Sequence, residues 1–272
     1  MPEESTKEVG RMSALLLTNI NNATIDLGIW DGDALVGTWS AATRAAMTAD
    51  EACLLVSSLL TLDPAGRAAL EGVSDGVLAS VVPALTEAWV EALSRLCGRR
   101  PLVVGPGVKT GLRMRYNDPG ELGADRVANL VAAVEAYGGP LVVLSAGTTT
   151  NLEVIDGQGA FLGGIIAPGL RLSAHALSQG AARLAEVDLR LPQGVIGKNT
   201  REAMQIGVVL GEAARLEGLL AAVWEQLGRE TAVVATGPDA AIIAALSRRA
   251  VRVDETLTLR GLALIHARNR KA

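Results

Sequence analysis

The sequence repeats one plan of strand, short polar turn and strand in two places about 125 residues apart. Each copy then turns at an Asp-Gly pair between apolar runs, which is a strong hairpin signal. The first copy lies in residues 15–39, with its polar turn at 19–24, and the second in residues 141–165, with its polar turn at 145–150. The duplication predicts an α/β chain of two related domains that face each other across a cleft.

The segments between and after the two copies carry helical patterns, as expected of α/β domains. A chain of 272 residues is long enough for about two domains. We place the first at residues 13–117 and the second at residues 118–272, after a polar leader at residues 1–12. Apolar periodicity predicts helices at 48–60, 85–96, 127–137, 201–227 and 257–268, and short strands at 102–104 and 232–235.

The charge balance argues against several classes of partner. Lys and Arg number 25 and Asp and Glu 29, a net charge of -4, so the chain has no overall field for gripping a polyanion. Nucleic acid is therefore not an expected partner. The N-terminal residues are acidic where a signal peptide would be basic, and no apolar run is long enough to span a bilayer. We expect a cytoplasmic protein without a membrane partner.

The two polar turns are the candidates for nucleotide binding. Small residues with free backbone N–H groups and hydroxyls can surround phosphate oxygens without steric conflict. The second turn, with Gly147 followed by Thr148, fits this chemistry better than the first. An ordinary hairpin turn remains the alternative for either one alone, and their occurrence in a duplicated frame favours a phosphate site.

The stretch Gly123-Ala124-Asp125-Arg126 carries adjacent opposite charges just ahead of a predicted helix. One interpretation is a helix cap followed by a solvated arginine, because a carboxylate at a helix N-terminus is stabilised by the helix dipole. The other makes Asp125 a general base that takes a proton from a substrate hydroxyl, with Arg126 holding an anionic group.

Four ordered motifs carry a family resemblance: VGPGVKTGLRMRYNDPGELGADRVANLVAA, GGPLVVLSAGTTT, FLGGIIAPGL and VIGKNTREAMQIG. Together they resemble the type III pantothenate kinase family, and the common frame covers residues 15–269. The resemblance implies two RNase H-like domains of the acetate and sugar kinase, Hsp70 and actin-like ATPase superfamily, in a homodimer. It also implies phosphorylation of pantothenate by ATP at the start of coenzyme A synthesis, with magnesium and a monovalent cation, potassium or ammonium.

The resemblance carries roles onto individual residues. It makes Asp125 the catalytic base. The pantothenate residues that it implies are Tyr116, Gly123, Ala124, Arg126 and Thr200. The nucleotide residues that it implies are Asn19, Asn21, Asn22, Thr24, Gly147 and Thr148.

The sequence departs from the family pattern at the phosphate side. Asn19 occupies the position of the aspartate that would organise magnesium, and Ser145 that of the aspartate that would bind the monovalent cation. Asn21 replaces the glycine that would let phosphate approach. Losing one preorganised electrostatic element typically costs a factor of about 10² to 10³ in rate. We therefore expect weak or absent kinase activity.

Three functions stay open on the sequence. The first is an active pantothenate kinase that works with Asn19 and Ser145 in its loops. The second is a catalytically inactive relative, a pseudoenzyme, that binds pantothenate or a similar ligand in a regulatory or interaction role. The third is a kinase of another small hydroxy compound. A carboxylate such as Asp26 could also have moved toward the metal, although its place beside Leu27 in the predicted strand suggests that it faces solvent.

Overall fold

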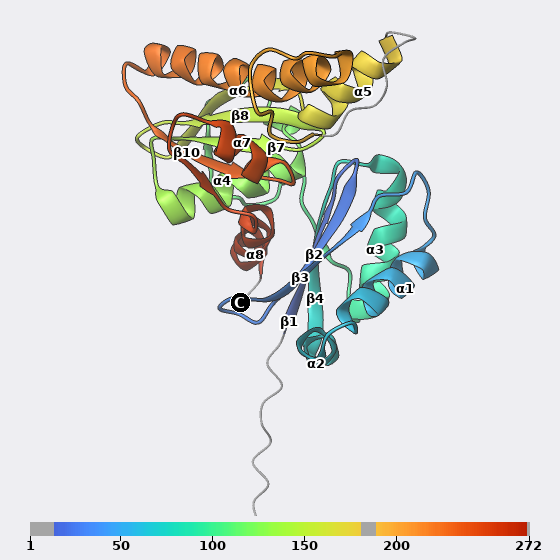
Figure 1. The fold of residues 1–272 in the computed structure, drawn as a ribbon. Helices are drawn as coiled ribbons and strands as arrows, with labels where there is room; N and C mark the ends of the chain where they lie inside the picture. Colours follow the sequence, from blue (N-terminus) through green and yellow to red (C-terminus); the bar gives the residue numbers. More distant parts are fainter. Residues whose placement is uncertain (1–13, 181–188, 271–272) are drawn as a thin grey trace, which may run out of the picture. The chain divides into compact units, whose positions relative to one another are not determined.

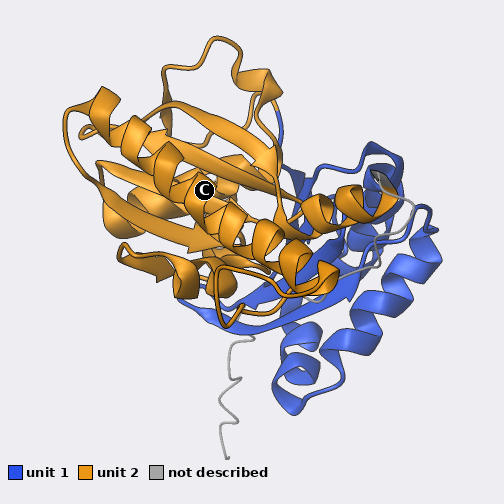
Figure 2. Cartoon of the chain, turned by 45° about the horizontal axis from the view of Figure 1, so that its top comes forward, with its two compact units in different colours: residues 1–105, 270–272 blue, residues 106–269 orange. Residues whose placement is uncertain are grey.

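The computed structural model describes residues 14–180 and 189–270 as two compact units. Unit 1 runs to Gly105, and unit 2 runs from Pro106 to Asn269 (Figure 2). Each unit contains one mixed β-sheet with helices packed against it. The α/β class predicted from the duplicated hairpins is confirmed.

The sheet of unit 1 is built around the first repeated hairpin (Figure 1). Its strand order is β3-β2-β1-β4-β5, with β1 antiparallel to β2 and parallel to β4. A parallel neighbour needs a crossover connection, and helices provide it here. The strands are β1 (Ala14–Ile20), β2 (Thr24–Trp30), β3 (Leu35–Ala42), β4 (Val73–Ser80) and β5 (Leu102–Val103).

The helices of unit 1 are α1 (Ala49–Leu60), α2 (Pro64–Gly72) and α3 (Pro83–Cys97). Thr48 and Glu51 form a capping box at the start of α1, which satisfies backbone N–H groups that the first turn leaves free. Side chains along each strand point alternately to the two faces of the sheet. Those of Leu16, Ile25 and Leu27 lie on one face, where they pack into a core with α1 and α3. The opposite face of β1 and β2 therefore carries the intervening side chains.

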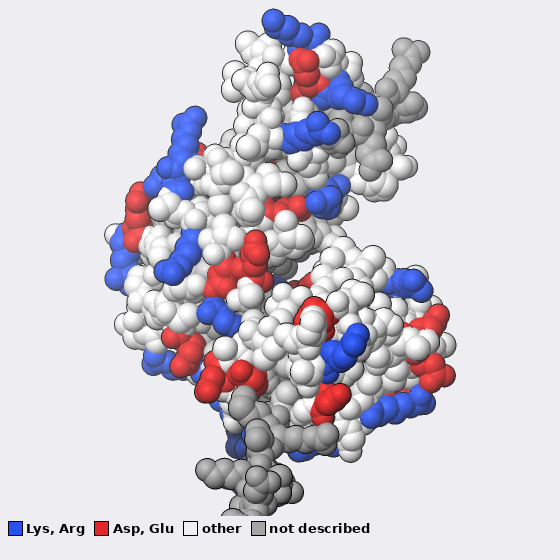
Figure 3. Space-filling model, turned by 60° about the horizontal axis from the view of Figure 1, so that its bottom comes forward, with Lys and Arg blue, Asp and Glu red and all other residues white. Residues whose placement is uncertain are grey.

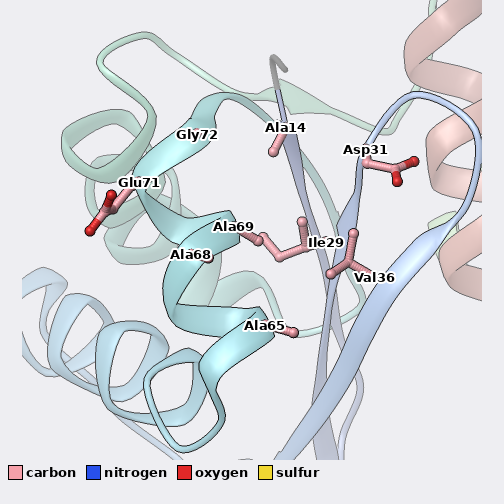
Figure 4. A pocket seen from close by; sticks show the side chains of 9 residues that line it. All are labelled: Ala14, Ile29, Asp31, Val36, Ala65, Ala68, Ala69, Glu71 and Gly72. Atoms are coloured by element: carbon pink, nitrogen blue, oxygen red, sulfur yellow. The ribbon is translucent and has the colours of Figure 1, made fainter. Parts of the chain in front are cut away.

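A hollow of about 390 Å³ lies between α2 and the β2–β3 hairpin (Figure 4). Ala65, Ala69 and Ile29 point into it, whereas the carboxylate of Glu71 points away. The hollow lies beside the first residue of β1, at the other end of that strand from the polar turn. Its lining is mostly apolar and consists of Ala14, Ile29, Asp31, Val36, Ala65, Ala68, Ala69, Glu71 and Gly72.

The sheet of unit 2 is built around the second repeated hairpin. Its order is β11-β10-β7-β8-β9-β6, with β7, β8 and β9 forming an antiparallel meander and β10 parallel to β7. The strands are β6 (Arg113–Met114), β7 (Leu141–Ala146), β8 (Thr149–Ile155), β9 (Ala160–Pro168), β10 (Ala232–Thr236) and β11 (Val251–Val253).

Helices cover both faces of this sheet. Val142, Leu144 and Leu152 pack on one face in a core with residues of α5, α6 and α7. The other face contacts α4, which packs in turn against α8, and Figure 1 shows α6 and α4 on opposite sides of the strands. These elements are the 3₁₀ turn η1 (Pro119–Glu121) and the helices α4 (Ala124–Tyr137), α5 (Leu170–Gly180), α6 (Thr200–Leu227), α7 (Ala240–Leu246) and α8 (Leu257–Asn269).

A glycine sets the close approach of α4 and α8. A Cβ atom added at Gly261 in α8 would lie 1.9 Å from the carbonyl oxygen of Ala128 in α4. Only a residue without a side chain allows the two backbones to come so near. Because Asp125 lies in the first turn of α4, this contact helps to fix the helix that carries the expected catalytic base.

The two hairpins share their turn chemistry as well as their strands. The Asp31 carboxylate accepts hydrogen bonds from the backbone N–H groups of Asp33 and Ala34, both 2.9 Å long. The Asp156 carboxylate accepts two bonds of the same length from Gln158 and Ala160. This agreement supports the internal duplication. Among the described residues, none of the helices is long and apolar enough to cross a membrane.

Candidate active site

One face of the unit 2 sheet brings polar side chains together beneath α4. Ser145 of β7 lies opposite Asn151 of β8, and Val143 lies opposite Glu153. Because directly opposite residues share a face and alternate residues return to it, Ser145, Asn151 and Glu153 point to the same side. Buried polar groups on the face of a core sheet require partners. α4 supplies them for Ser145 and Glu153.

Asp125 lies in the first turn of α4, where the helix dipole favours a negative charge. The N-cap residue is Gly123, and it makes no side-chain capping bond. Removal from water raises the pKa of the Asp125 carboxyl above its ordinary value of 3.8, while backbone hydrogen bonds and the Arg126 guanidinium oppose the shift. A raised pKa suits a carboxylate that must accept a proton during a reaction.

Arg126 is buried and donates from Nε to the Oε1 atom of Glu153 over 2.7 Å. The interpretation of Arg126 as a solvated arginine is therefore wrong. Glu153 is wholly buried, and desolvation raises its pKa to about 7, against the opposing effect of Arg126 and with a smaller contribution from the Asp125 charge. Asp125, Arg126 and Glu153 thus form one electrostatic group.

Ser145 belongs to a chain of neutral hydrogen bonds. Asn129 of α4 donates from Nδ2 to the Ser145 hydroxyl over 3.1 Å, and Thr258 of α8 donates to Asn129 Oδ1 over 2.6 Å. A neutral hydroxyl that already faces an N–H donor is a poor ligand for a cation. The residues at this position do not fit a monovalent cation.

The turn between β7 and β8 is closely surrounded by backbone. A Cβ atom at Gly169 would lie 2.1 Å from the Gly147 carbonyl oxygen, and one at Gly237 would lie 2.4 Å from the Ala146 carbonyl oxygen. Thr148 itself is exposed. Asp239 lies beside the turn, because its backbone N–H donates to the Ala146 carbonyl oxygen over 3.1 Å. Its side chain is buried, and its Oδ1 atom lies 3.3 Å from a guanidinium nitrogen of Arg171.

The other expected pantothenate residues are spread over unit 2. The Tyr116 ring packs against the buried Phe161 ring, with centroids 5.3 Å apart. Gly123 and Ala124 lead into α4, adjacent to Asp125. Thr200 is exposed at the first turn of α6, directly after the N-cap Asn199. Within residues 14–180 and 189–270, no hydrogen bond or ring contact joins Tyr116 or Thr200 to Asp125.

The remaining expected nucleotide residues lie in unit 1, at the turn between β1 and β2. Asn19 is buried near the end of β1, and its Oδ1 atom has no hydrogen-bond partner among the described residues. Asn21 donates from its backbone N–H to the Thr24 carbonyl, which closes the turn, and Asn22 is exposed at its tip. Asp26, expected to face solvent, is half-buried instead.

Charge on the surface is mixed. Figure 3 shows basic and acidic side chains interspersed over the face drawn. Within residues 14–180 and 189–270, no group of three or more His, Cys, Asp or Glu side chains is arranged to hold a metal ion.

The sequence motifs do not point to the buried acidic residues Glu153, Glu212 and Asp239. Glu153 stands in the apolar run Leu152-Glu153-Val154-Ile155, and a charged residue in such a run is a detectable signal of a buried pair. Glu212 in the middle of α6 is also buried, where it accepts a hydrogen bond from Thr150 over 2.6 Å and pairs with Arg215. Glu212 faces the α6 side of the sheet, away from Asp125.

The duplicated hairpins, the two mixed sheets and the polar turn at the end of β7 define an α/β fold of the actin-like ATPase class. A solved structure of the activator of the 2-hydroxyisocaproyl-CoA dehydratase from Clostridium difficile with bound ADPNP is similar to this chain in fold, with a TM-score of 0.55. The match covers 95% of this chain and 100% of that one at 11% identity, so it bears on the fold alone.

The sequence profile of type III pantothenate kinase matches residues 15–222. The type III pantothenate kinase of Moorella thermoacetica is 41% identical over 94% of this chain and 99% of its own. That of Acidobacterium capsulatum is 42% identical over 94% of this chain and 95% of its own. The chain belongs to the type III pantothenate kinase family.

Proposed function

We propose that this chain transfers the terminal phosphoryl group of ATP to the hydroxyl of pantothenate, at a rate well below that of a kinase with a full set of acidic residues. The observation that carries the proposal is the group formed by Asp125, Arg126 and Glu153 at the start of α4. It combines a carboxylate of raised pKa with a buried, oriented guanidinium. Family membership supplies the substrates.

Asp125 is the proposed general base. It takes the proton from the pantothenate hydroxyl as the oxygen attacks the terminal phosphorus, and the bond from that phosphorus to the leaving oxygen of ADP breaks. The proton that arrives on Asp125 removes a negative charge which otherwise raises the pKa of Glu153. The electrostatic group thus responds as a unit to the proton transfer.

Arg126 is the proposed anchor of the acceptor. A guanidinium has five N–H donors in a rigid fork. The Nε donor is committed to Glu153, which fixes the plane of the group and leaves the remaining donors for an anionic part of pantothenate. Gly123, which has no side chain, and Ala124, which has a small one, leave space for the acceptor beside Asp125. Tyr116 and Thr200 complete the proposed pocket.

ATP is the proposed phosphoryl donor. Gly147 and Thr148 in unit 2, and Asn19, Asn21, Asn22 and Thr24 in unit 1, are the residues assigned to it. Magnesium fits this set in one respect, because the Asn19 Oδ1 atom is a buried oxygen without a partner among the described residues. Magnesium neutralises charge on the transferring group, and a neutral amide supports it less well than a carboxylate.

A monovalent cation has no place in the proposal, because Ser145 is neutral and already faces the Asn129 amide. The loss of one preorganised charge lowers rates by about 10² to 10³, and two losses beside one phosphate need not multiply. A low but measurable turnover is the result. The proposed assembly is the homodimer of the family, which sedimentation velocity tests.

A second candidate function is a pantothenate-binding protein without catalysis. The observation that favours it is the uneven distribution of change, since Asn19 and Ser145 are neutral while Asp125 and Arg126 are retained. Such a protein would bind pantothenate in a calorimeter and leave ATP intact.

The deciding experiment incubates the purified chain at high concentration with ATP, magnesium and pantothenate, and measures phosphopantothenate by mass spectrometry. We expect product that disappears in Asp125→Ala. Absence of product at stoichiometric enzyme, with pantothenate binding intact, would reject the kinase in favour of the binding protein. ATP consumption only with a different hydroxy compound would reassign the acceptor.

A further inference from the structure

The turn between β1 and β2 has an acidic residue on the same face as Asn19. The register of the two antiparallel strands places Asn19 directly opposite Asp26, and Asp26 directly opposite Ser40 of β3. Directly opposite residues project to the same side of a sheet, with Cβ atoms about 5 Å apart. Leu16, Ile25 and Leu27 occupy the other side, where α1 and α3 pack. The Asn19 and Asp26 side chains are therefore neighbours on the face without these helices.

Asn19 contributes an oxygen that the fold leaves unused. The residue is only 3% exposed, and no described residue donates a hydrogen bond to its Oδ1 atom. A buried carbonyl oxygen without a hydrogen-bond donor is energetically unfavourable. A ligand with a positive charge or a hydrogen-bond donor would remove that cost.

Asp26 contributes a carboxylate that is held in place. It accepts hydrogen bonds from Asn21 Nδ2 over 3.1 Å, Thr24 Oγ1 over 3.4 Å and Ser40 Oγ over 2.8 Å. All three donors are neutral, and no ion pair with a described Lys, Arg or His is recorded for Asp26. The negative charge is thus oriented but not neutralised by a described side chain.

We propose that Asp26 supplies the carboxylate ligand, and Asn19 the neutral oxygen ligand, for the divalent cation that accompanies ATP. This inference rests on the proposed function, which assigns the turn between β1 and β2 to the nucleotide. Magnesium in kinases is typically held by one or two carboxylates together with substrate phosphates, so one carboxylate beside one amide is a sufficient protein contribution.

The negative charge of Asp26 should affect ATP binding in opposite directions with and without a divalent cation, and this difference can be tested. Without a divalent cation, a carboxylate on this face repels the phosphates of ATP. With a cation between them, the same carboxylate attracts the complex. If Asp26 only stabilised the hairpin turn, its removal would lower stability and leave nucleotide binding alone, or strengthen it by removing the repulsion.

The experiment titrates Mn²⁺ into the full chain with a non-hydrolysable ATP analogue and follows free Mn²⁺ by electron paramagnetic resonance. We expect Asp26→Asn to weaken Mn²⁺ binding by about tenfold or more, as loss of metal-supporting residues does. Analogue binding in excess chelator, measured by calorimetry, should not weaken. The matched control is Asp33→Asn, which removes the same charge from the exposed turn at the other end of β2 and should change neither quantity.

A second variant guards against a simple loss of structure. Asn19→Asp combined with Asp26→Asn returns one carboxylate to the same face from the opposite strand, and it should recover most of the Mn²⁺ affinity. Thermal unfolding checks that every variant is folded. Unchanged Mn²⁺ affinity in folded D26N, tighter analogue binding with metal present, or no Mn²⁺ binding to the unaltered chain would each overturn the proposal.

The two proposals fail separately. If Mn²⁺ binding depends on Asp26 but no phosphopantothenate forms, the proposed kinase activity is rejected and the proposed cation site is supported. If phosphopantothenate forms but the Mn²⁺ affinity is the same in Asp26→Asn as in the unaltered chain, the proposed cation site is rejected and the proposed kinase activity is supported.

Discussion

The contact between α4 and α8 predicts opposite outcomes for one substitution at two helical glycines. Gly261→Ala places a Cβ atom 1.9 Å from the Ala128 carbonyl oxygen, where ordinary contacts begin at 3.4 Å. The obstacle is backbone, so no side chain can rotate away and the helices must separate. Gly218 in α6 has nothing within 4 Å of an added Cβ atom. Gly218→Ala is therefore the matched control within unit 2.

The magnitudes follow from two effects. Alanine stabilises a helix interior by about 0.5–1 kcal/mol relative to glycine. Overpacking a close contact costs about 1–3 kcal/mol or more. The free energy of unfolding should thus fall by about 2 kcal/mol in Gly261→Ala and rise by about 0.5–1 kcal/mol in Gly218→Ala. For a unit of this size the expected shifts in Tm are about 4–8 °C downward for Gly261→Ala and about 1–4 °C upward for Gly218→Ala.

Differential scanning calorimetry of the full chain measures both shifts, and hydrogen exchange of α4 identifies the unit that changes. α4 carries Asp125 and Arg126, so Gly261→Ala should also weaken pantothenate binding, whereas Gly218→Ala should not. A Gly261→Ala variant as stable as the unaltered chain would refute the argument, because it would mean that the two backbones do not meet at this position.

Three further predictions concern the polar residues of unit 2. Asp125→Asn should lower kcat by a factor of about 10² to 10⁴, while calorimetry still detects pantothenate binding. In the unaltered chain, kcat/KM should fall at acidic pH, starting above the usual aspartate range because the pKa of Asp125 is raised. This fall should be absent in Asp125→Asn. Burial keeps a proton on Glu153 up to about pH 7 in the folded chain, against an ordinary pKa of 4.5, so the free energy of unfolding should fall on the order of 3 kcal/mol as pH rises between these values. Urea unfolding at several pH values should find that slope missing in Glu153→Gln, and parallel curves would contradict the shift. Turnover should not depend on potassium or ammonium because Ser145 is neutral, and a rate that rises severalfold with potassium would show that the Asn129 contact does not exclude the cation.

The elements that could be predicted from the sequence are those with a strong local pattern. The repeated hairpins could be predicted because each copy has apolar runs on both sides of an explicit Asp-Gly turn. β4 was missed because Ser74, Asp75 and Gly76 interrupt its apolar run, and its pairing with β1 comes from the sheet rather than from local preference. α2 was also missed, although Asp63 followed by Pro64 is a recognisable helix start.

Within the candidate site, sequence motifs located Asp125 but not its electrostatic surroundings. Arg126 could be interpreted either as solvated or as a ligand-binding residue, and only the structure shows that Glu153 of β8 is its partner. The alternation of side-chain direction along a strand predicts which residues share a face of the sheet. It does not predict whether helices pack on both faces. The position of Asp26 opposite Asn19 likewise depends on strand register, which residue order alone leaves undetermined.

The direct pairing of positions 19 and 26 also bears on how this protein could change over evolutionary time. An aspartate introduced at position 19 would stand opposite Asp26, and like charges at directly opposed positions destabilise a sheet. An acidic residue at 19 would therefore cost the fold less stability if the acidic residue at 26 were replaced before it or together with it. The two sites form an epistatic pair in which the order of substitution matters.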